Sequence, residues 1–258
     1  MIKNFILVHY EKKITTKLER YIESKFSIYR KRAIVQKKFI NYAIKQIRYF
    51  YKNANIHVIC KDKNHPILQK NKKEIILHEF TDMQCNHIDK FKIFGLLNEP
   101  SMYFDLDILL VKPFEEHHLE TKNPFNVFRD YKGAEEFRPN GLNKNVDFNV
   151  YNNGIVWINE PSKDLENEFI SINQKHFSNE NEWLKNDEFA VSKFINDNKL
   201  KMNLCWDVGH YRLKDQYGVL PKIDINEMKK YQSIHYSIAK EAFMCEYSLL
   251  WAEKYINI

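Results

Sequence analysis

The chain has 258 residues, a formal net charge of +6, 44% hydrophobic residues and 14% aromatic residues. This composition can build a sizeable core, and no apolar run approaches the ~20 residues of a membrane-spanning helix, so an integral membrane protein is excluded and a soluble α/β protein is expected. The first residues lead straight into an apolar stretch of strand length without a small-residue cleavage site, so nothing indicates export. Four scattered cysteines without a C-x-x-C pair fit reduced thiols and a cytoplasmic setting.

The charge is unevenly distributed along the chain. Residues 1–73 hold 19 Lys and Arg against 4 Asp and Glu, whereas the remainder holds 21 against 30. The basic N-terminal third could face an anionic membrane, a nucleic acid or a phosphorylated substrate, or form the solvated surface of lysine-rich helices. These interpretations stay open at this point.

Apolar periodicity predicts alternating strands and helices over the first hundred residues. The expected elements in chain order are a strand over 4–10, a basic amphipathic helical layer over 12–51, a strand over 56–60, a loop around Pro66, a strand over 74–80 and a helix over 89–97. Strands that alternate with helices favour a mostly parallel sheet covered by helices on both faces. Such sheets bind ligands beyond the carboxyl ends of their strands.

Residues 101–111, Ser-Met-Tyr-Phe-Asp-Leu-Asp-Ile-Leu-Leu-Val, read as a buried strand that contains two acids. Side chains alternate along a strand, so Asp105 and Asp107 should share one face. Two like charges in apolar surroundings need a cation, and the run contains no Lys or Arg, which favours Mg²⁺ or Mn²⁺. Alternatively, the acids face water at a strand end, or they lie at a bend between two strands, because residues 108–111 continue the apolar pattern.

The second half of the chain begins with a loop-rich stretch. It is expected over 113–147 and precedes a strand over 155–158, helices over 161–177 and 186–195, an extended segment over 233–237, and a C-terminal helix through about 251.

The segment from Tyr103 to Pro113 resembles the D-x-D segment of GT-A nucleotide-sugar glycosyltransferases. It is most similar to the retaining, glycogenin-like glycosyltransferase family 8, and its D-x-D-x-x-x-x-K-P spacing is similar to that of a mannosyltransferase group. The resemblance implies one GT-A domain over 1–258. Its nucleotide-binding half, 1–113, would end in the D-x-D strand, and its acceptor-side half, 114–258, would include the C-terminal helix.

Three further segments resemble family positions that contact the donor sugar. Lys90 opens the helix before the D-x-D, Asn152 and Asn153 lie in Tyr-Asn-Asn-Gly-Ile-Val, and Asp187 lies in Asn-Asp-Glu. The resemblance implies donor binding by Lys90, Asn152 and Asn153, and a catalytic role for Asp187 near the reacting carbon. Structural alternatives are a solvated lysine, an Asn-Asn-Gly turn and a helix N-cap.

A fourth segment, Ile-His-Tyr-Ser-Ile-Ala-Lys over 234–240, resembles the family segment whose His completes the metal shell and whose Lys binds the diphosphate. The implied metal ligands are Asp105, Asp107 and His235. Lys240 would contact the diphosphate, although it stands one residue nearer to His235 than in the family and the family's Gly and Pro-Trp are replaced. Tyr10, after the first strand, could stack on the nucleobase.

Together these segments imply a Mn²⁺- or Mg²⁺-dependent glycosyltransferase that moves a sugar from a nucleoside-diphosphate sugar, with UDP-sugar as the expected donor, to a glycan, lipid or protein acceptor. No carboxylate stands out as a covalent nucleophile, so the resemblance implies retention through same-face attack. Nucleic acid is not an expected partner of such an enzyme, and the basic third leaves a peripheral contact with anionic membrane open.

Two other functions remain. A metal-dependent nucleotidyltransferase or nuclease would use Asp105 and Asp107 and would give the basic third a nucleic acid to bind, but two-metal chemistry normally needs a third acid nearby. A non-catalytic protein on the same fold would bind a sugar nucleotide without turning it over.

Overall fold

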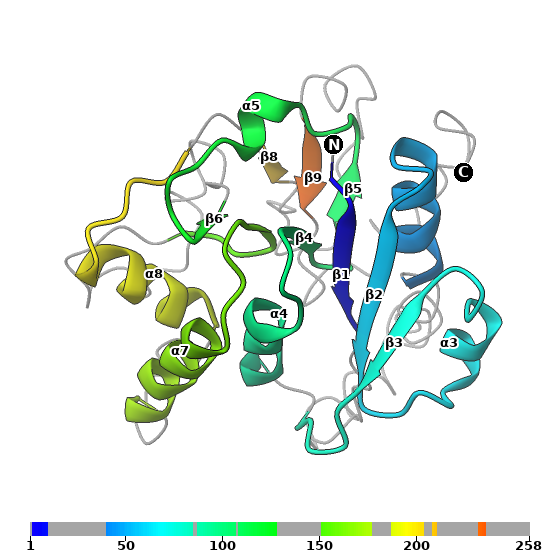
Figure 1. Ribbon diagram of the computed structural model, residues 1–258, viewed down its shortest axis with the longest axis horizontal. Helices are drawn as coiled ribbons and strands as arrows, with labels where there is room; N and C mark the ends of the chain where they lie inside the picture. The colour runs from blue at the N-terminus through cyan, green and yellow to red at the C-terminus, as the bar shows by residue number, and fades with distance from the viewer. Residues whose placement is uncertain are drawn as a thin grey trace, which may run out of the picture.

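The computed structural model of the protein describes residues 2–9, 40–84, 87–106, 108–127, 151–176, 187–203, 208–210 and 232–235. Within these ranges the chain forms an α/β structure with a main sheet, a smaller sheet and helices on both faces of the main sheet (Figure 1). The predicted fold class is confirmed.

The main sheet has the strand order β3-β2-β1-β4-β7-β6 among the described residues. Its strands are β1 (Asn4–Val8), β2 (Asn55–Cys60), β3 (Ile76–Glu79), β4 (Ser101–Phe104), β6 (Phe125–Val127) and β7 (Ile155–Ile158). β1 is parallel to β2 and to β4, β2 is parallel to β3, and β7 runs antiparallel to both β4 and β6. Every residue of β1, β4 and β7 is buried, as expected for strands covered on both faces.

Each face of the sheet packs against its own set of helices. On one face, Phe5 and Leu7 of β1 contact a core that includes the helix over residues 40–50 and α3 (Pro66–Lys70). On the other face, Ile6 and Val8 join a core built with η1 (His87–Phe91), α4 (Lys92–Gly95), α7 (Lys163–Lys175) and α8 (Asp187–Asp197). Figure 1 shows α4, α7 and α8 together on one side of the sheet and α3 on the other.

The smaller sheet joins β5 (Ile108–Leu110) to β9 (Ser233–His235) and β8 (Val208–His210). β5 is antiparallel to β9, and β8 is parallel to β9. A buried glutamine of the helix over 40–50 ties β5 to the main body: Gln46 Oε1 accepts from the N–H of Leu110 at 2.6 Å, and its Nε2 donates to the carbonyl of Ile108 at 3.5 Å.

Several expected elements differ from the observed ones. The expectation of a single strand over 101–111 is wrong, because the segment is divided between β4 and β5, which belong to different sheets. The alternative, a bend between two strands, is confirmed. The stretch around Pro66 forms α3, since proline is compatible with the first turn of a helix. The stretch expected to be loop over 113–147 contains α5 (Glu116–Leu119) and β6. The helix expected over 12–51 is present over 40–50, and its earlier part and the C-terminal helix lie outside the described residues.

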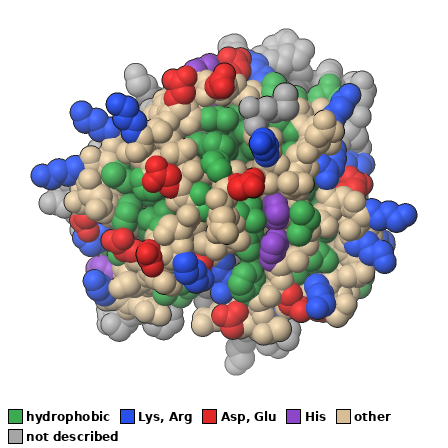
Figure 2. All heavy atoms as spheres, in the orientation of Figure 1, with side chains coloured by type: hydrophobic (Ala, Val, Ile, Leu, Met, Phe, Trp, Pro, Cys, Tyr) green, Lys and Arg blue, Asp and Glu red, His purple; other side chains and the backbone are tan. Residues whose placement is uncertain are grey.

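One face of the described surface carries charged side chains of both signs. On the face in Figure 2, Lys and Arg side chains are interspersed with Asp and Glu, whereas nucleic-acid binding favours a surface of one sign. Most of the lysine-rich stretch before residue 40 lies outside the described residues. Among the helices that the structure describes, none combines the length and the apolar character that crossing a membrane would require.

Candidate functional site

The two-acid segment lies at the junction of the two sheets. β4 ends at Phe104, and the N–H of Asp105 donates to the carbonyl of Gly154 at 2.7 Å. The carbonyl of Asp105 then accepts from the N–H of Ile108 at 3.0 Å, so the chain turns into β5. Asp105 therefore stands beyond the carboxyl end of a parallel strand, where open α/β sheets bind ligands.

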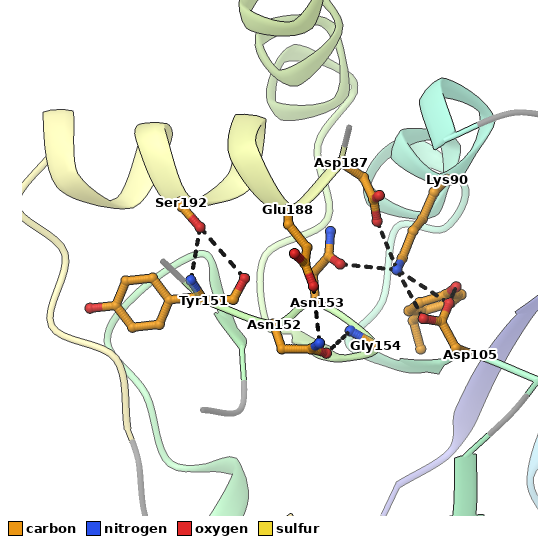
Figure 3. A network of polar contacts seen from close by, with 10 residues as sticks. Lys90, Asp105, Tyr151, Asn152, Asn153, Gly154, Asp187, Glu188 and Ser192 are labelled. Atoms are coloured by element: carbon orange, nitrogen blue, oxygen red, sulfur yellow. Dashed lines mark hydrogen bonds and ion pairs between the residues drawn. The ribbon is translucent and has the colours of Figure 1, made fainter. Parts of the chain in front are cut away.

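Lys90 provides the positive charge at the centre of this site. It comes from η1 and is only 5% exposed. Its Nζ lies 2.9 Å from Oδ2 of Asp187, 3.2 Å from Oδ1 and 3.3 Å from Oδ2 of Asp105, and 3.1 Å from Oδ1 of Asn153 (Figure 3). The segment around Asp105 supplies no cation of its own, and the fold brings one from a different element.

The two carboxylates keep Lys90 in its charged form. Burial alone would lower the pKa of Lys90, but the carboxylates of Asp105 and Asp187 raise it above its ordinary value. Lys90 therefore stays protonated at neutral pH. With both carboxylates ionised, the single positive charge of Lys90 is set against two negative charges, so the cluster keeps an excess negative charge that could attract a further cation.

Tyr103 belongs to the same cluster, although the sequence reasoning did not select it. Its hydroxyl donates to Oδ1 of Asp105, and the Nζ of Lys90 lies 5.0 Å from the centre of its ring. The side chain is buried within β4. Tyr103 and Asp105 are two residues apart, so strand alternation places them on one face, and this spacing could have revealed the tyrosine.

The loop over 151–154 is tied to α8 through Ser192 and Glu188, and Oγ of Ser192 also donates to the carbonyl of Tyr151 at 3.5 Å. The N–H of Tyr151 donates to Oγ of Ser192 at 2.9 Å, and Nδ2 of Asn152 donates to Oε1 of Glu188 at 3.1 Å (Figure 3). Oδ1 of Asn152 also accepts from the N–H of Gly154 at 2.7 Å, which closes a tight turn. Glu188 and Ser192 lie one helical turn apart, so α8 presents both to the loop.

Four of the selected residues thus meet in one network, with Lys90 in contact with Asp105, Asn153 and Asp187, and a fifth, Asn152, lies beside Asn153 in the loop. The asparagines also serve the structural alternative, because they shape a turn. The solvated-lysine alternative for Lys90 is wrong, since its side chain is buried. Asp187 is the first residue of α8, and its carboxylate contacts Lys90. Sequence reasoning did not select Tyr103, Glu188 or Ser192.

The structure does not describe the side chains of the remaining selected residues. Tyr10, Asp107 and Lys240 lie outside the described residues, as does the side chain of His235. The backbone of His235 is described, and in the pairing of β5 with β9 it stands opposite Ile108, the residue that follows Asp107. The chain therefore sets the His-bearing strand directly beside the D-x-D segment.

The donor types around this junction suit a hard divalent cation. Carboxylate oxygens with one imidazole nitrogen are compatible with Mn²⁺ or Mg²⁺. Asp105 has a partly exposed carboxylate that such an ion could reach. Considering described side chains alone, no group of three or more His, Cys, Asp and Glu residues could hold a metal; Asp107 and the side chain of His235 are not among them.

A histidine pair lies near the carboxyl ends of β1 and β2. His9 follows β1, its N–H donates to the carbonyl of Ile59 at 2.9 Å, and its ring centre lies 4.8 Å from that of His65. Burial, helped by the neighbouring His65, lowers the pKa of His9 to about 4. His9 is therefore neutral at physiological pH.

Comparisons with known proteins identify the fold. No family model matches the sequence, and no curated protein matches it significantly. Among solved structures, the galactosyltransferase LgtC in complex with donor and acceptor sugar analogs has 10% sequence identity and a TM-score of 0.54, over 97% of this chain and 95% of that chain. The glycosyltransferase GlyE of Streptococcus pneumoniae TIGR4 has 14% identity and a TM-score of 0.56, over 99% of this chain and 63% of that chain.

A third structure, the apo form of the bifunctional glycosyltransferase WbbM, has 12% identity and a TM-score of 0.52, over 92% of this chain and 45% of that chain. The similarity therefore extends over nearly all of this chain, while the chain spans less than two thirds of GlyE and of WbbM. At such low identities the similarity establishes the fold alone. The chain has the GT-A fold of these glycosyltransferases.

Proposed function

We propose that this protein is a glycosyltransferase that moves a sugar from a nucleoside-diphosphate sugar, with a UDP-sugar as the expected donor, to a glycan, lipid or protein acceptor. The observation that carries the proposal is the convergence of Lys90, Asp105, Asn153 and Asp187 at the carboxyl end of β4 in a GT-A fold. The fold alone would not distinguish an enzyme from a scaffold. A buried cluster of charged and amide groups at the ligand-binding edge of the sheet is what favours a site.

The chemistry of the cluster matches the demands of a donor sugar. Hydroxyl groups both donate and accept hydrogen bonds, and the cluster offers carboxylate acceptors, amide groups and an ammonium donor. In this role Lys90, Asn152 and Asn153 bind the sugar, and Asp187 lies near the reacting carbon as the catalytic residue. LgtC, which shares the fold, was solved with donor and acceptor sugar analogs.

The nucleoside diphosphate leaves with growing negative charge, which nearby positive charge stabilises. Asp105, Asp107 and His235 would hold Mn²⁺ or Mg²⁺, which supplies such charge when bound. Lys240 would contact the diphosphate, and Tyr10 would stack on the nucleobase. We further propose retention of configuration: the bond from the anomeric carbon to the diphosphate oxygen breaks, the acceptor hydroxyl attacks from the same face, and its proton passes to the departing diphosphate.

The basic N-terminal third suggests where the acceptor is located. Because Lys and Arg outnumber acids 19 to 4 over residues 1–73, an acceptor at an anionic membrane surface is compatible with peripheral binding by the N-terminal third. Co-flotation with vesicles that contain anionic lipid, compared with neutral vesicles, tests that contact.

A screen of nucleotide sugars tests the central proposal. The purified chain is incubated with UDP-, GDP-, ADP- and CMP-sugars and Mn²⁺, and release of the nucleotide is measured with and without EDTA. We expect release from a UDP-sugar that EDTA abolishes, together with a higher melting temperature in UDP plus Mn²⁺. A chain that binds a sugar nucleotide without releasing the nucleotide would be a binding protein, and absence of both binding and release would contradict the proposal.

A further inference from the structure

The ammonium group of Lys90 is surrounded by oxygen atoms from three side chains. Oxygens of Asp105, Asn153 and Asp187 lie between 2.9 and 3.3 Å from Nζ. These are more oxygen atoms than an ammonium group has N–H bonds. Lys90 is thus surrounded in the manner of a coordinated cation rather than held by a single ion pair.

Lys90 occupies space that a divalent cation on Asp105 would need. Both carboxylate oxygens of Asp105 lie within 3.3 Å of the ammonium, and Oδ1 also accepts from the hydroxyl of Tyr103. Two cations that share these oxygens would repel each other strongly in a site where Lys90 is 5% exposed. A metal ion can therefore bind Asp105 well only when Lys90 moves off it.

Lys90 has other hydrogen-bond acceptors within reach when it leaves Asp105. Asp187, at the first residue of α8, has the shortest contact to Nζ, and Asn153 provides a neutral acceptor. Asp187 is 5% exposed, so its carboxylate also needs Lys90 as a partner. Small rotations of the flexible lysine side chain can exchange contact with Asp105 for closer contact with Asp187 and with an incoming anion.

We propose that Lys90 is a built-in counter-ion that competes with the divalent cation for Asp105, and that binding of the diphosphate donor relieves this competition. The proposal rests on the proposed function, because it assigns a regulatory role within the same site. A metal ion alone then binds weakly, since it must displace Lys90. Metal and nucleoside diphosphate together bind cooperatively, because the diphosphate carries negative charge that attracts both cations.

The test measures Mn²⁺ binding by calorimetry and by Mn²⁺ paramagnetic resonance, without any turnover. In Lys90→Met the competing charge is absent, and we expect Mn²⁺ alone to bind about tenfold more tightly than to the wild-type chain. The dependence of Mn²⁺ affinity on UDP should become smaller, because only the attraction between Mn²⁺ and the diphosphate remains. Lys92→Met removes the same charge two residues away, where Nζ contacts Asp82 at 3.3 Å, and is expected to change Mn²⁺ affinity little.

A second variant keeps the net charge of the wild-type chain. It also avoids leaving the buried carboxylate of Asp187 without Lys90, which could prevent folding. Lys90→Met combined with Asp187→Asn leaves the net charge of the chain unchanged and removes the ammonium group from Asp105, which keeps its hydrogen bond from Tyr103. It too should bind Mn²⁺ about tenfold more tightly than the wild-type chain. Equal or weaker binding of Mn²⁺ to this double variant, in a chain whose wild-type form releases nucleotide from a sugar donor, would overturn the counter-ion role alone. If the wild-type chain binds neither Mn²⁺ nor UDP and releases no nucleotide, the proposed function falls with it.

Discussion

Lys90 and Asp187 link η1 to α8 through a buried ion pair, with Nζ of the lysine 2.9 Å from Oδ2 of the aspartate and each side chain at most 7% exposed. The pair joins two elements almost a hundred residues apart in sequence. The same ammonium group of Lys90 also contacts Asp105 and Asn153 (Figure 3). The stability of the fold and the shape of the site therefore depend on the same contact.

This ion pair predicts a large energetic coupling. Lys90→Met should destabilise the chain by roughly 2–4 kcal/mol, because it leaves carboxylates without their cation in a buried site. Asp187→Asn added to Lys90→Met should recover part of that loss, with a coupling of about 1–3 kcal/mol in a double-mutant cycle measured by denaturant unfolding.

The exposed pair Lys193 and Asp197 on α8, with Nζ 2.9 Å from Oδ2, provides the matched control. Its coupling is expected to be only about 0.3–0.5 kcal/mol. A Lys90–Asp187 coupling no larger than that of this surface pair would show that the buried pair does not stabilise the site.

Ser192 is predicted to position the loop over 151–154 through Tyr151. Ser192 is fully buried, and Ser192→Ala leaves the N–H of Tyr151 without its acceptor, which should destabilise the chain by about 1–2 kcal/mol. Because the loop carries Asn152 and Asn153, the KM for the donor should rise more than kcat falls.

Asn198→Ala, just beyond the end of the same helix, removes a contact of Nδ2 to the carbonyl of Phe194 and not to the loop, and should leave the KM for the donor unchanged. Ser192→Thr keeps a hydroxyl at this position and should restore part of the donor binding. An unchanged KM in Ser192→Ala would remove the positioning role.

Gln46 is predicted to fix β5, and with it the end of the D-x-D segment. Gln46→Leu fills a similar volume but leaves the buried N–H of Leu110 without an acceptor, at a cost of about 1–3 kcal/mol. Hydrogen exchange should report faster exchange at Leu110 in this variant. Gln69→Leu, which removes an exposed contact to the carbonyl of Lys63, is the control and should leave Leu110 protected. Equal protection of Leu110 in both variants would contradict the account of β5.

His9 predicts that stability falls under mildly acidic conditions. Its pKa is about 4 in the folded chain, below the ordinary value of 6.5. The unfolded chain therefore binds a proton first as the pH falls, so the contribution of neutral His9 is complete above pH 6.5 and is lost as the pH falls toward 4. The loss is at most about 1.4 kcal/mol per pH unit over this window.

His57 lies in β2 with Nδ1 2.9 Å from Nε2 of His78, and burial also lowers its pKa to about 4, so it acts in the same direction. Urea unfolding between pH 7 and 4.5 should therefore show a steeper loss of stability in the wild-type chain than in His9→Gln. Asn198→Ala, which removes no titrating group, should retain the wild-type slope. A His9→Gln slope as steep as that of the wild-type chain would show that His9 does not carry the effect.

The sequence predicts several strands of the main sheet because their local patterns are unambiguous, whereas β6 lies in a stretch that was expected to be loop. Phe5-Ile6-Leu7-Val8 and Ile155-Val156-Trp157-Ile158 are short apolar runs between polar residues, and both form strands where expected. The local pattern of 101–111 allows both one strand and a bend between two strands, and it does not decide between them. The division depends on pairing of β5 with β9, more than a hundred residues later, and on the hydrogen bond from Asp105 to Gly154 that ends β4.

The site was predictable in part for the same reason. Lys90, Asn153 and Asp187 stand in segments that resemble a known family, and the structure brings them together with Asp105. Local pattern cannot show that Lys90 from η1 reaches Asp105. The search for a positive charge beside the two acids therefore considered only residues 101–111 and did not include Lys90. Ser192 gave no signal, because its role depends on contacts to the backbone of Tyr151, which lies 41 residues earlier in the chain.

The rate of nucleotide release by Asp187→Asn tests the account most directly. The substitution removes one negative charge from the centre of the proposed site at the first residue of α8, and Asp197→Asn makes the same change at the exposed last residue of that helix. With the donor found in the nucleotide-sugar screen, we expect Asp187→Asn to reduce Mn²⁺-dependent release at least about 100-fold and Asp197→Asn to retain the wild-type rate. A folded Asp187→Asn chain that releases nucleotide as fast as Asp197→Asn would contradict the assignment of this cluster as the glycosyltransferase site.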